Sequence, residues 1–195
     1  MTRIVGGLWG GRRLVTPDGE TTRPTSEKVR AALASSLTAA GGLDGARVLD
    51  LYAGSGALGL ELVSRGAASA VFVERDRAAL VALRSNVATL HDAAARAGGT
   101  AAAMTVVPGD VAAFVARSAG TGPFDIVVAD PPYDLATDAL LAGYLDLHHH
   151  GLLAPHADLI LERSRRSGDP VWPSPLEGVR TRKYGDTLLC YGRAP

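Results

Sequence analysis

The 195-residue sequence contains little that would tie it to a membrane or to an oxidising compartment. Cys190 is the sole cysteine, so an internal disulfide is impossible. The N-terminus lacks the apolar block of a signal peptide, and no stretch approaches the roughly 18 uninterrupted apolar residues of a membrane-spanning helix. Net charge is absent too, since 20 basic side chains balance 20 acidic ones. We therefore expect a cytoplasmic protein with no membrane partner.

The zero net charge hides an uneven distribution along the chain. Residues 1–30 and 163–195 together contain thirteen basic and six acidic side chains, whereas residues 31–162 contain seven and fourteen. If the two ends of the chain lie on one face, they form a basic surface suited to nucleic acid. A solvated surface of mixed charge explains the counts equally well. With 47% hydrophobic residues, the chain is long enough to bury one large core without cross-links.

Apolar segments typical of strands alternate with Ala- and Leu-rich segments typical of helices. The strand segments are residues 47–51, 70–73, 104–107, 124–128 and 159–161. The helical segments are residues 58–65, 77–90, 111–119 and 135–147. Two further strands, residues 179–183 and 187–191, flank Gly185-Asp186, which is typical of a hairpin turn. This order predicts an α/β fold with a mostly parallel, seven-stranded, Rossmann-like sheet that ends in an antiparallel hairpin.

A separate hairpin is predicted before the first of these strands. Residues 3–15 contain two short apolar stretches on either side of a glycine-rich turn, Gly6-Gly7-Leu8-Trp9-Gly10-Gly11. We expect a small β-hairpin outside the main sheet. Thr25 or Ser26 is then expected to cap a helix that runs to about residue 37. Residues 92–103 are expected to form a loop, and three prolines exclude a helix from residues 164–178.

A glycine-rich loop follows the first strand of the predicted sheet. The run Gly54-Ser55-Gly56-Ala57-Leu58-Gly59 opens a helix, and Glu74 ends the next strand twenty residues after Gly54. This spacing satisfies the dinucleotide fingerprint, so a NAD-dependent oxidoreductase is one interpretation. Asp50 argues against it, because a carboxylate at this strand end would repel a pyrophosphate and attract a cation. S-adenosylmethionine offers both an ammonium and a sulfonium, with no phosphate.

Carboxylates occur where four of the predicted strands give way to loops, at Asp50, Glu74, Asp110 and Asp130. In an open parallel sheet, ligands bind outside the carboxyl ends of the strands, so these four side chains are expected to line one crevice. We assign Asp50 to the amino acid moiety of S-adenosylmethionine, Glu74 to its ribose hydroxyls and Asp110 to its adenine amine. Acidic residues also cap helices, which is the alternative for Asp110 and for Asp76.

The run Asp130-Pro131-Pro132-Tyr133 comes directly after an apolar strand. The exocyclic amine of a nucleobase is a poor nucleophile, because its lone pair is delocalised into the ring. Asp130 can accept one N–H of such an amine and the Pro131 carbonyl the other, while Tyr133 offers a stacking face. The motif therefore predicts methylation of a base that is flipped out or unpaired. A stiff turn after a strand is the alternative interpretation.

These segments together resemble the RsmD family of 16S ribosomal RNA guanine methyltransferases. The resemblance rests on residues 48–61 (VLDLYAGSGALGLE), Glu74, residues 124–133 (FDIVVADPPY), residues 3–14 (RIVGGLWGGRRL), Arg23-Pro24-Thr25 and Val29-Arg30. It implies a class I S-adenosylmethionine-dependent methyltransferase fold. It also implies transfer of methyl to the 2-amino nitrogen of guanine 966, within an assembled or partly assembled 30S subunit, with S-adenosylhomocysteine as the product.

We assign three groups of residues to this function. The catalytic group is Asp130, Pro131, Pro132 and Tyr133. The cofactor group is Asp50, Tyr52, Ala53, Gly54, Ser55, Gly56, Glu74, Arg75, Asp110 and Val111. The RNA group is Arg3, Trp9, Arg12, Arg13, Arg23, Pro24, Thr25 and Lys28. The basic residues of this last group would neutralise phosphates around the target base, and Trp9 would stack or pack. Residues 1–22 would then form an RNA-docking extension and residues 23–195 the catalytic domain.

Two other functions stay open at this point. A DNA adenine or cytosine amino-methyltransferase would use the same catalytic motif, although the short chain leaves little with which to read a DNA sequence. The NAD-dependent oxidoreductase is the other. We expect no metal, because His148, His149 and His150 are consecutive and point in different directions on a helix. The expected partner is 16S rRNA, and the expected state is a monomer.

Overall fold

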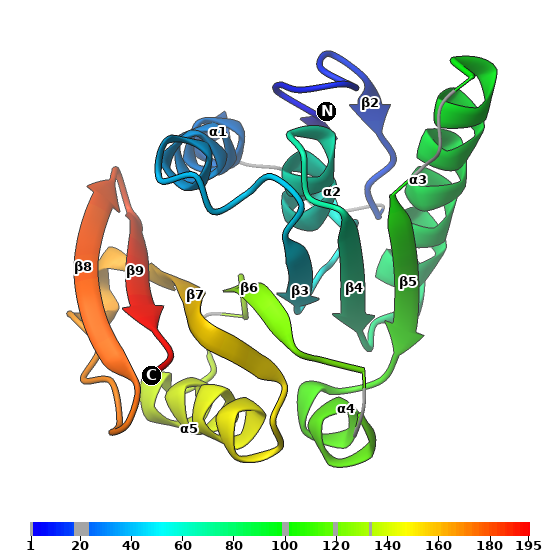
Figure 1. Ribbon diagram of the computed structural model, residues 1–195. Helices are drawn as coiled ribbons and strands as arrows, with labels where there is room; N and C mark the ends of the chain where they lie inside the picture. Colours follow the sequence, from blue (N-terminus) through cyan, green and yellow to red (C-terminus); the bar gives the residue numbers. More distant parts are fainter. Residues whose placement is uncertain (1, 18–23, 99–101, 119–120, 133) are drawn as a thin grey trace.

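The computed structural model describes residues 2–17, 24–98, 102–118, 121–132 and 134–195. Its centre is a seven-stranded sheet with the order β5-β4-β3-β6-β7-β9-β8 (Figure 1). The strands are β3 (Arg47–Leu51), β4 (Ser69–Glu74), β5 (Ala103–Pro108), β6 (Phe124–Ala129), β7 (Leu153–Ser164), β8 (Glu177–Tyr184) and β9 (Thr187–Arg193). Strands β3 to β7 pair in parallel, and β9 runs antiparallel to both β7 and β8. The predicted mostly parallel sheet with a C-terminal antiparallel hairpin is confirmed.

Helices cover both faces of this sheet. One face packs against α1 (Pro24–Ala39), α2 (Ala57–Ser64) and α3 (Arg77–Arg96). The other packs against α4 (Val111–Arg117) and α5 (Thr137–His149). The alternation of side chains along a strand explains the two cores, because Val48 of β3 belongs to the first and its neighbour Leu49 to the second. Strands buried on both faces need the continuous apolar runs that the sequence contains.

Four boundaries differ from the sequence-based expectation. Helix α3 continues to Arg96, so the prediction that a loop begins at residue 92 was wrong. Ala93 and Ala94 are buried, and alanine favours helix. Helix α1 begins at Pro24, which places Thr25 and Ser26 within its first turn instead of at its cap. Strand β7 is twelve residues long, well beyond residues 159–161, because β9 pairs with its second half. A short 3₁₀ turn at Arg165–Ser167 precedes the three prolines.

The predicted N-terminal hairpin is present as a separate two-stranded sheet of β1 (Thr2–Arg3) and β2 (Arg13–Leu14). Ile4, Trp9 and Leu14 are buried in the first core. The hairpin lies along α2, and its glycine-rich turn reaches the last residue of that helix, where the Leu8 amide donates to the Ser64 carbonyl at 2.7 Å. The hairpin is therefore outside the sheet but packed firmly against the main body.

The chain order fixes where a ligand can bind. From the central strand β3, the chain moves to β4 and β5 on one side and later to β6 and β7 on the other. Such a reversal opens a crevice at the carboxyl ends of the two strands where it occurs, here β3 and β6. No helix in the described ranges is long and apolar enough to cross a membrane.

Candidate functional site at the carboxyl ends of the strands

The glycine-rich loop after β3 is held in an unusual backbone conformation. Tyr52, Gly54 and Gly56 all have left-handed φ angles, of 58°, 56° and 81°. Glycine adopts this conformation without cost, whereas Tyr52 is strained there. The loop is fastened to the end of β4, because the Ala53 amide donates to the Val73 carbonyl at 3.1 Å and the Gly54 amide to Glu74 Oε2 at 2.7 Å. The twenty-residue spacing between Gly54 and Glu74 thus produces a direct contact.

Gly59 brings helix α2 unusually close to the sheet. A Cβ at this position would lie 2.5 Å from the Phe72 ring and 2.8 Å from Asp50 Oδ2. The close approach lets the Gly59 amide donate to Asp50 Oδ2 at 2.9 Å. Asp50 is 1% exposed and lies beneath the loop, under the first turn of α2. Sequence reasoning found this carboxylate, but its observed contact is with the protein's own backbone.

Burial and neighbouring charge make Asp50 easy to protonate. Burial raises the pKa of Asp50 to about 7, although the hydrogen bond from Gly59 works in the opposite direction. The nearby carboxylates of Asp130 and Glu74 contribute to the same upward shift of the pKa. All three acidic groups therefore share one region of negative potential. Glu74 and Asp130 line the cavity as expected, whereas Asp50 is buried beneath the loop and does not line it.

A cavity of about 710 Å³ opens above this loop. Its walls include six of the predicted cofactor residues and two of the predicted catalytic residues: Tyr52, Gly54, Glu74, Arg75, Asp110 and Val111, with Asp130 and Pro132. The volume is typical of a site for a small organic ligand. Ala53 and Ser55 are buried, and Gly56 caps helix α2, so these three residues shape the loop.

Most of the carboxylates around the cavity are oriented by backbone amides. Glu74 Oε1 accepts from the amides of Arg75 and Asp76, both at 2.7 Å. Asp76 caps α3 by accepting from the Ala79 amide at 2.8 Å, in agreement with the capping alternative. The capping alternative also holds for Asp110, which accepts from the amide at the third position of α4. Because amides are neutral, they fix these carboxylates without cancelling their charge, and the cavity suits a cationic ligand.

The predicted catalytic motif begins where β6 ends. Asp130 and Pro132 line the cavity, whereas Pro131 is buried and does not line it. Tyr133 lies outside the described residues. The Leu135 amide donates to the Pro132 carbonyl at 3.2 Å, so the segment after the two prolines turns back on itself. This arrangement presents a carboxylate at the wall of the cavity on a short, proline-stiffened turn.

Arg163 supports this turn and was missed by sequence reasoning. Its Nη2 donates to the Leu135 carbonyl at 2.6 Å, and the side chain is 3% exposed. Nε and Nη1 have no hydrogen-bond partner among the described groups. Buried guanidinium groups are costly, so an arginine at this position needs a reason. The available signal was an arginine two positions after the apolar run of residues 159–161.

Asn86 is a second functional candidate that the sequence did not reveal. It lies on the apolar face of α3 and is 2% exposed. Its side chain exchanges two hydrogen bonds with the backbone of Val15, at 2.8 and 2.9 Å, and donates to the Ser55 carbonyl at 2.9 Å. One amide therefore ties the end of the N-terminal hairpin to the glycine-rich loop. A polar residue within an apolar helical stripe was the only signal.

The predicted RNA residues do not converge on the cavity as a group. Arg3 pairs with Glu27 at 3.4 Å, while Arg13 and Lys28 are exposed and Arg12 is half-buried. Trp9 is 7% exposed. Of its two predicted roles, stacking on RNA or packing in the protein, the structure therefore supports packing. Arg23 lies outside the described residues, and Pro24 and Thr25 are described as the backbone of α1.

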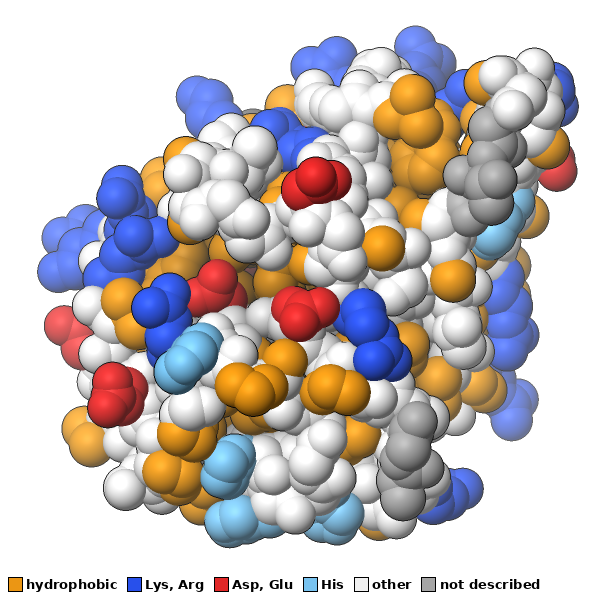
Figure 2. All heavy atoms as spheres, viewed as in Figure 1, with side chains coloured by type: hydrophobic (Ala, Val, Ile, Leu, Met, Phe, Trp, Pro, Cys, Tyr) orange, Lys and Arg blue, Asp and Glu red, His pale blue; other side chains and the backbone are white. Residues whose placement is uncertain are grey.

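Lysine and arginine side chains are nevertheless numerous over the elements near the two ends of the sequence, although others lie on the opposite side of the molecule (Figure 2). Figure 2 shows them around β8 and α1 and over the N-terminal hairpin, the elements that contain the two ends of the sequence. The Arg180 side chain of β8 contacts α1 directly, through Ser36 Oγ at 2.6 Å. The two basic ends of the chain thus approach one another, which was the condition set for a nucleic-acid surface.

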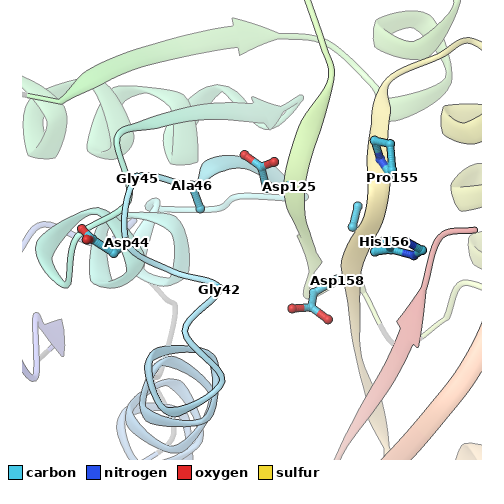
Figure 3. Close-up of a pocket in the computed structure, with 9 residues that line it drawn as sticks. Gly42, Asp44, Gly45, Ala46, Asp125, Pro155, His156 and Asp158 are labelled. Atoms are coloured by element: carbon cyan, nitrogen blue, oxygen red, sulfur yellow. The ribbon is translucent and has the colours of Figure 1, made fainter.

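A second acidic hollow, of about 350 Å³, lies where β3, β6 and β7 begin. Asp44, Asp125 and Asp158 surround it and spread apart around the opening (Figure 3). Asp158 Oδ1 pairs with Arg193 Nη2 at 3.2 Å, and Asp125 Oδ2 accepts from the Arg47 amide at 2.8 Å. Within the described part of the chain, no group of three or more His, Cys, Asp or Glu side chains is arranged to hold a metal ion.

Comparisons with known proteins agree with this geometry. The family described as conserved hypothetical protein 95 matches residues 2–193. Ribosomal RNA small subunit methyltransferase D of Escherichia coli K12 is 39% identical over 173 residues, covering 88% of this chain and 79% of that protein. YlbH of Bacillus subtilis, named as a candidate rRNA methyltransferase, is 33% identical and 95% of each chain is covered.

Solved structures agree as well. A candidate methyltransferase from E. coli superposes with a TM-score of 0.80 at 35% identity, covering 98% of this chain and 97% of that one. Magnesium protoporphyrin IX methyltransferase of Synechocystis, solved with bound S-adenosylmethionine, has a TM-score of 0.64 at 18% identity, covering 99% of this chain and 88% of that one. Because the sequence identity to the Synechocystis enzyme is only 18%, this second similarity is a similarity of fold alone.

Proposed function

Because this chain belongs to the family of conserved hypothetical protein 95, the RsmD family, we propose that it transfers a methyl group from S-adenosylmethionine to small-subunit ribosomal RNA. One observation supports this function above the others. The acidic cavity joins the Gly54–Glu74 contact on one side to Asp130 and Pro132 on the other. A cationic methyl donor and an acceptor for an amine would thus meet in one enclosure.

The residues present fit S-adenosylmethionine better than a dinucleotide. Four carboxylates and one arginine line the cavity. This excess of negative charge favours the binding of a positively charged ligand and disfavours the binding of a pyrophosphate. Glu74 would accept from the ribose hydroxyls in addition to its backbone amides, and the second carboxylate oxygen of Asp110 would accept from the adenine amine while the first caps α4. Asp50 would act from beneath the loop, by its charge and by fixing Gly59.

When bound, S-adenosylmethionine supplies the methyl group, which passes to the amine by direct displacement. Asp130 would accept one N–H of the target amine and the Pro131 carbonyl the other, which turns the nitrogen lone pair toward the methyl group. Tyr133 would stack on the flipped base. After transfer, the acidified amine can release its proton to Asp130 or to water. The chain thus contributes alignment and hydrogen-bond acceptors.

The finer specificity belongs to the same proposal. We propose the 2-amino nitrogen of guanine 966 in 16S rRNA as the acceptor, in the context of a 30S subunit or an assembly intermediate. The exposed arginine and lysine of the hairpin and of α1 would contact phosphates, with residues 1–22 as the docking extension and residues 23–195 as the catalytic domain. Since the hairpin turn lies at the far end of α2 from the glycine loop, these contacts would be peripheral to the base.

The test is methyl transfer from labelled S-adenosylmethionine to 30S subunits, naked 16S rRNA and duplex DNA. Label in 16S rRNA, mapped to guanine 966 by primer extension and mass spectrometry of nucleosides, is the expected result. Label in duplex DNA alone would favour an amino-methyltransferase acting on DNA. Binding of NAD in place of S-adenosylmethionine would favour an oxidoreductase. Either of these outcomes would contradict the proposal.

A further inference from the structure

The pairing of the C-terminal strands brings basic residues to the same edge of the sheet as Asp130. Ala129, the last residue of β6, lies opposite Leu161 of β7, and β7 continues for three more residues beyond it. The register then places Ser164 opposite the first residue of β9, and that residue opposite the last residue of β8. The edge where β6 ends therefore also holds four cations, which we call the basic rim: Arg165, Arg166, Arg182 and Lys183.

All four side chains of the basic rim are exposed. The ion pairs found in the described part of the chain involve Arg3, Arg65 and Arg193, none of which belongs to the rim. Arg193 makes the contrast clear, because it lies at the opposite edge of the sheet and pairs there with Asp158. The rim cations thus keep their charge available for a partner in solution.

The rim is also held in place. The Arg165 amide donates to the Asp186 carbonyl at 2.8 Å, which fastens the 3₁₀ turn to the turn between β8 and β9. Ser164 caps the same turn by accepting from the Arg166 amide at 3.3 Å. The two segments that contribute the rim are consequently fixed relative to each other, and less ordering is needed when a partner binds.

We propose that the basic rim binds phosphates of the RNA strand that enters the cavity. This inference rests on the proposed function, since it names a surface on which that substrate would lie. A basic strip beside a site for a flipped base is where the backbone on either side of that base must pass. Lysine and arginine also protect exposed edge strands from pairing with other chains, which could explain Arg182 and Lys183. That explanation does not extend to Arg165 and Arg166, which lie outside any strand.

The test compares two double variants that remove the same charge. Arg165→Ala with Arg166→Ala changes the rim, and Arg84→Ala with Arg96→Ala changes two exposed arginines on α3. Helix α3 and strand β8 lie at opposite ends of the molecule (Figure 1), so the control leaves the rim untouched. Equilibrium binding to a 16S rRNA fragment that contains guanine 966 is measured between 50 and 200 mM salt, values of the order used to separate counterion effects.

The rim variant should bind RNA more weakly and depend less on salt than the wild type. Each lost phosphate contact should reduce the slope of log K against log salt by about 0.7 to 0.9. The α3 variant should keep the wild-type slope, and both should keep the wild-type affinity for S-adenosylmethionine and the wild-type melting temperature. An unchanged slope and affinity in the rim variant would overturn the inference.

The same samples separate this inference from the proposed function. If the wild type methylates rRNA and the rim variant does so with an unchanged KM for rRNA, the inference that the rim binds RNA is wrong. The proposed methyltransferase function would still hold. The wild type could instead methylate no RNA while the rim variant, unlike the α3 variant, loses the salt-dependent binding of RNA. The proposed function would then be wrong, and the rim would still be an RNA-binding surface. A charge reversal at Arg165 and Arg166 should enlarge the loss of affinity that the alanine variant shows.

Discussion

Two acidic hollows lie at opposite ends of the central strands, and they differ in what surrounds their carboxylates. At the beginnings of the strands, Asp158 pairs with the cationic side chain of Arg193. At the ends of the strands, Glu74, Asp76 and Asp110 accept from backbone amides, which are neutral. An arginine ion pair partly neutralises the first hollow, whereas the second, lined by four carboxylates and one arginine, keeps an excess of negative charge for a ligand. The number of acidic side chains is therefore less informative than the groups that contact them.

Strand β6 offers the sharpest way to break this comparison, because it has an aspartate at each end. Asp130→Ala should reduce methyl transfer by about 10² to 10³-fold or more, since the target amine loses its acceptor, while affinity for S-adenosylmethionine stays nearly unchanged. Asp130→Asn should retain part of the activity, because an amide oxygen still accepts. Steady-state and single-turnover assays with labelled donor measure both.

Asp125→Ala is the matched control at the other end of the same strand. It removes the acceptor of the Arg47 amide, so stability should fall by about 1 kcal/mol, with no change in the transfer rate per folded molecule. If Asp125→Ala and Asp130→Ala had equal effects on the rate, the two hollows would not differ in function. Equal loss of donor binding in both Asp130 variants would instead make that residue structural.

Two glycines sharpen the comparison through packing. Gly59→Ala should destabilise the protein by about 1 to 3 kcal/mol, because its Cβ would press on Phe72 and on the Asp50 carboxylate. Gly42→Ala, beside the far hollow, should change stability little, since its Cβ would stand 3.5 Å from Asp158 Oδ2. Urea denaturation measures the free energy of unfolding for each. A larger loss for Gly42→Ala would mean that the far hollow is the more tightly built of the two.

The smallest expected effect is on the pH dependence of donor binding. The pKa of Asp50 is about 7, so near neutral pH a fraction of the molecules carries a proton there. A bound cation favours the ionised form and lowers this pKa, so binding should release a fraction of a proton and affinity should rise between about pH 6 and pH 8. Calorimetry in two buffers of different ionisation enthalpy measures the release.

Asp50→Asn should abolish this proton release, and Asp158→Asn should leave it unchanged. Proton uptake on binding, or a release that persists in Asp50→Asn, would show that another group titrates. The comparison places the effect at one end of the sheet, because the far hollow contains no carboxylate that raises the pKa of Asp50; Asp130 and Glu74 do so.

Much of the fold followed from local patterns. Residues 47–51 and 124–128 are predominantly apolar, and both became central strands of the sheet. The glycine-rich loop, Glu74 and Asp130 were predicted to meet at one edge, and they do. The RsmD resemblance, drawn from residues spread over the chain, is confirmed by the family match. The loop from residue 92 was wrong, because an Ala-rich segment was given no helical preference.

The contacts that refine the site could not be predicted in this way. Asn86 bonds to Val15, 71 positions away, and Arg163 to Leu135, 28 positions away. Neither pair has a local pattern that connects its members. Trp9 could have stacked on RNA or packed inside, and only its position against α2 decided for packing.

The sequence by itself determined the elements, their order and the edge of the sheet where chemistry could occur, because strand and helix preferences and the rule for parallel sheets act over short segments. The tertiary structure decided which carboxylates are neutralised, which one is buried enough to hold a proton, and which basic residues share an edge with Asp130. Those properties depend on the dielectric surroundings and neighbours of each charge, which come from residues far apart in the chain.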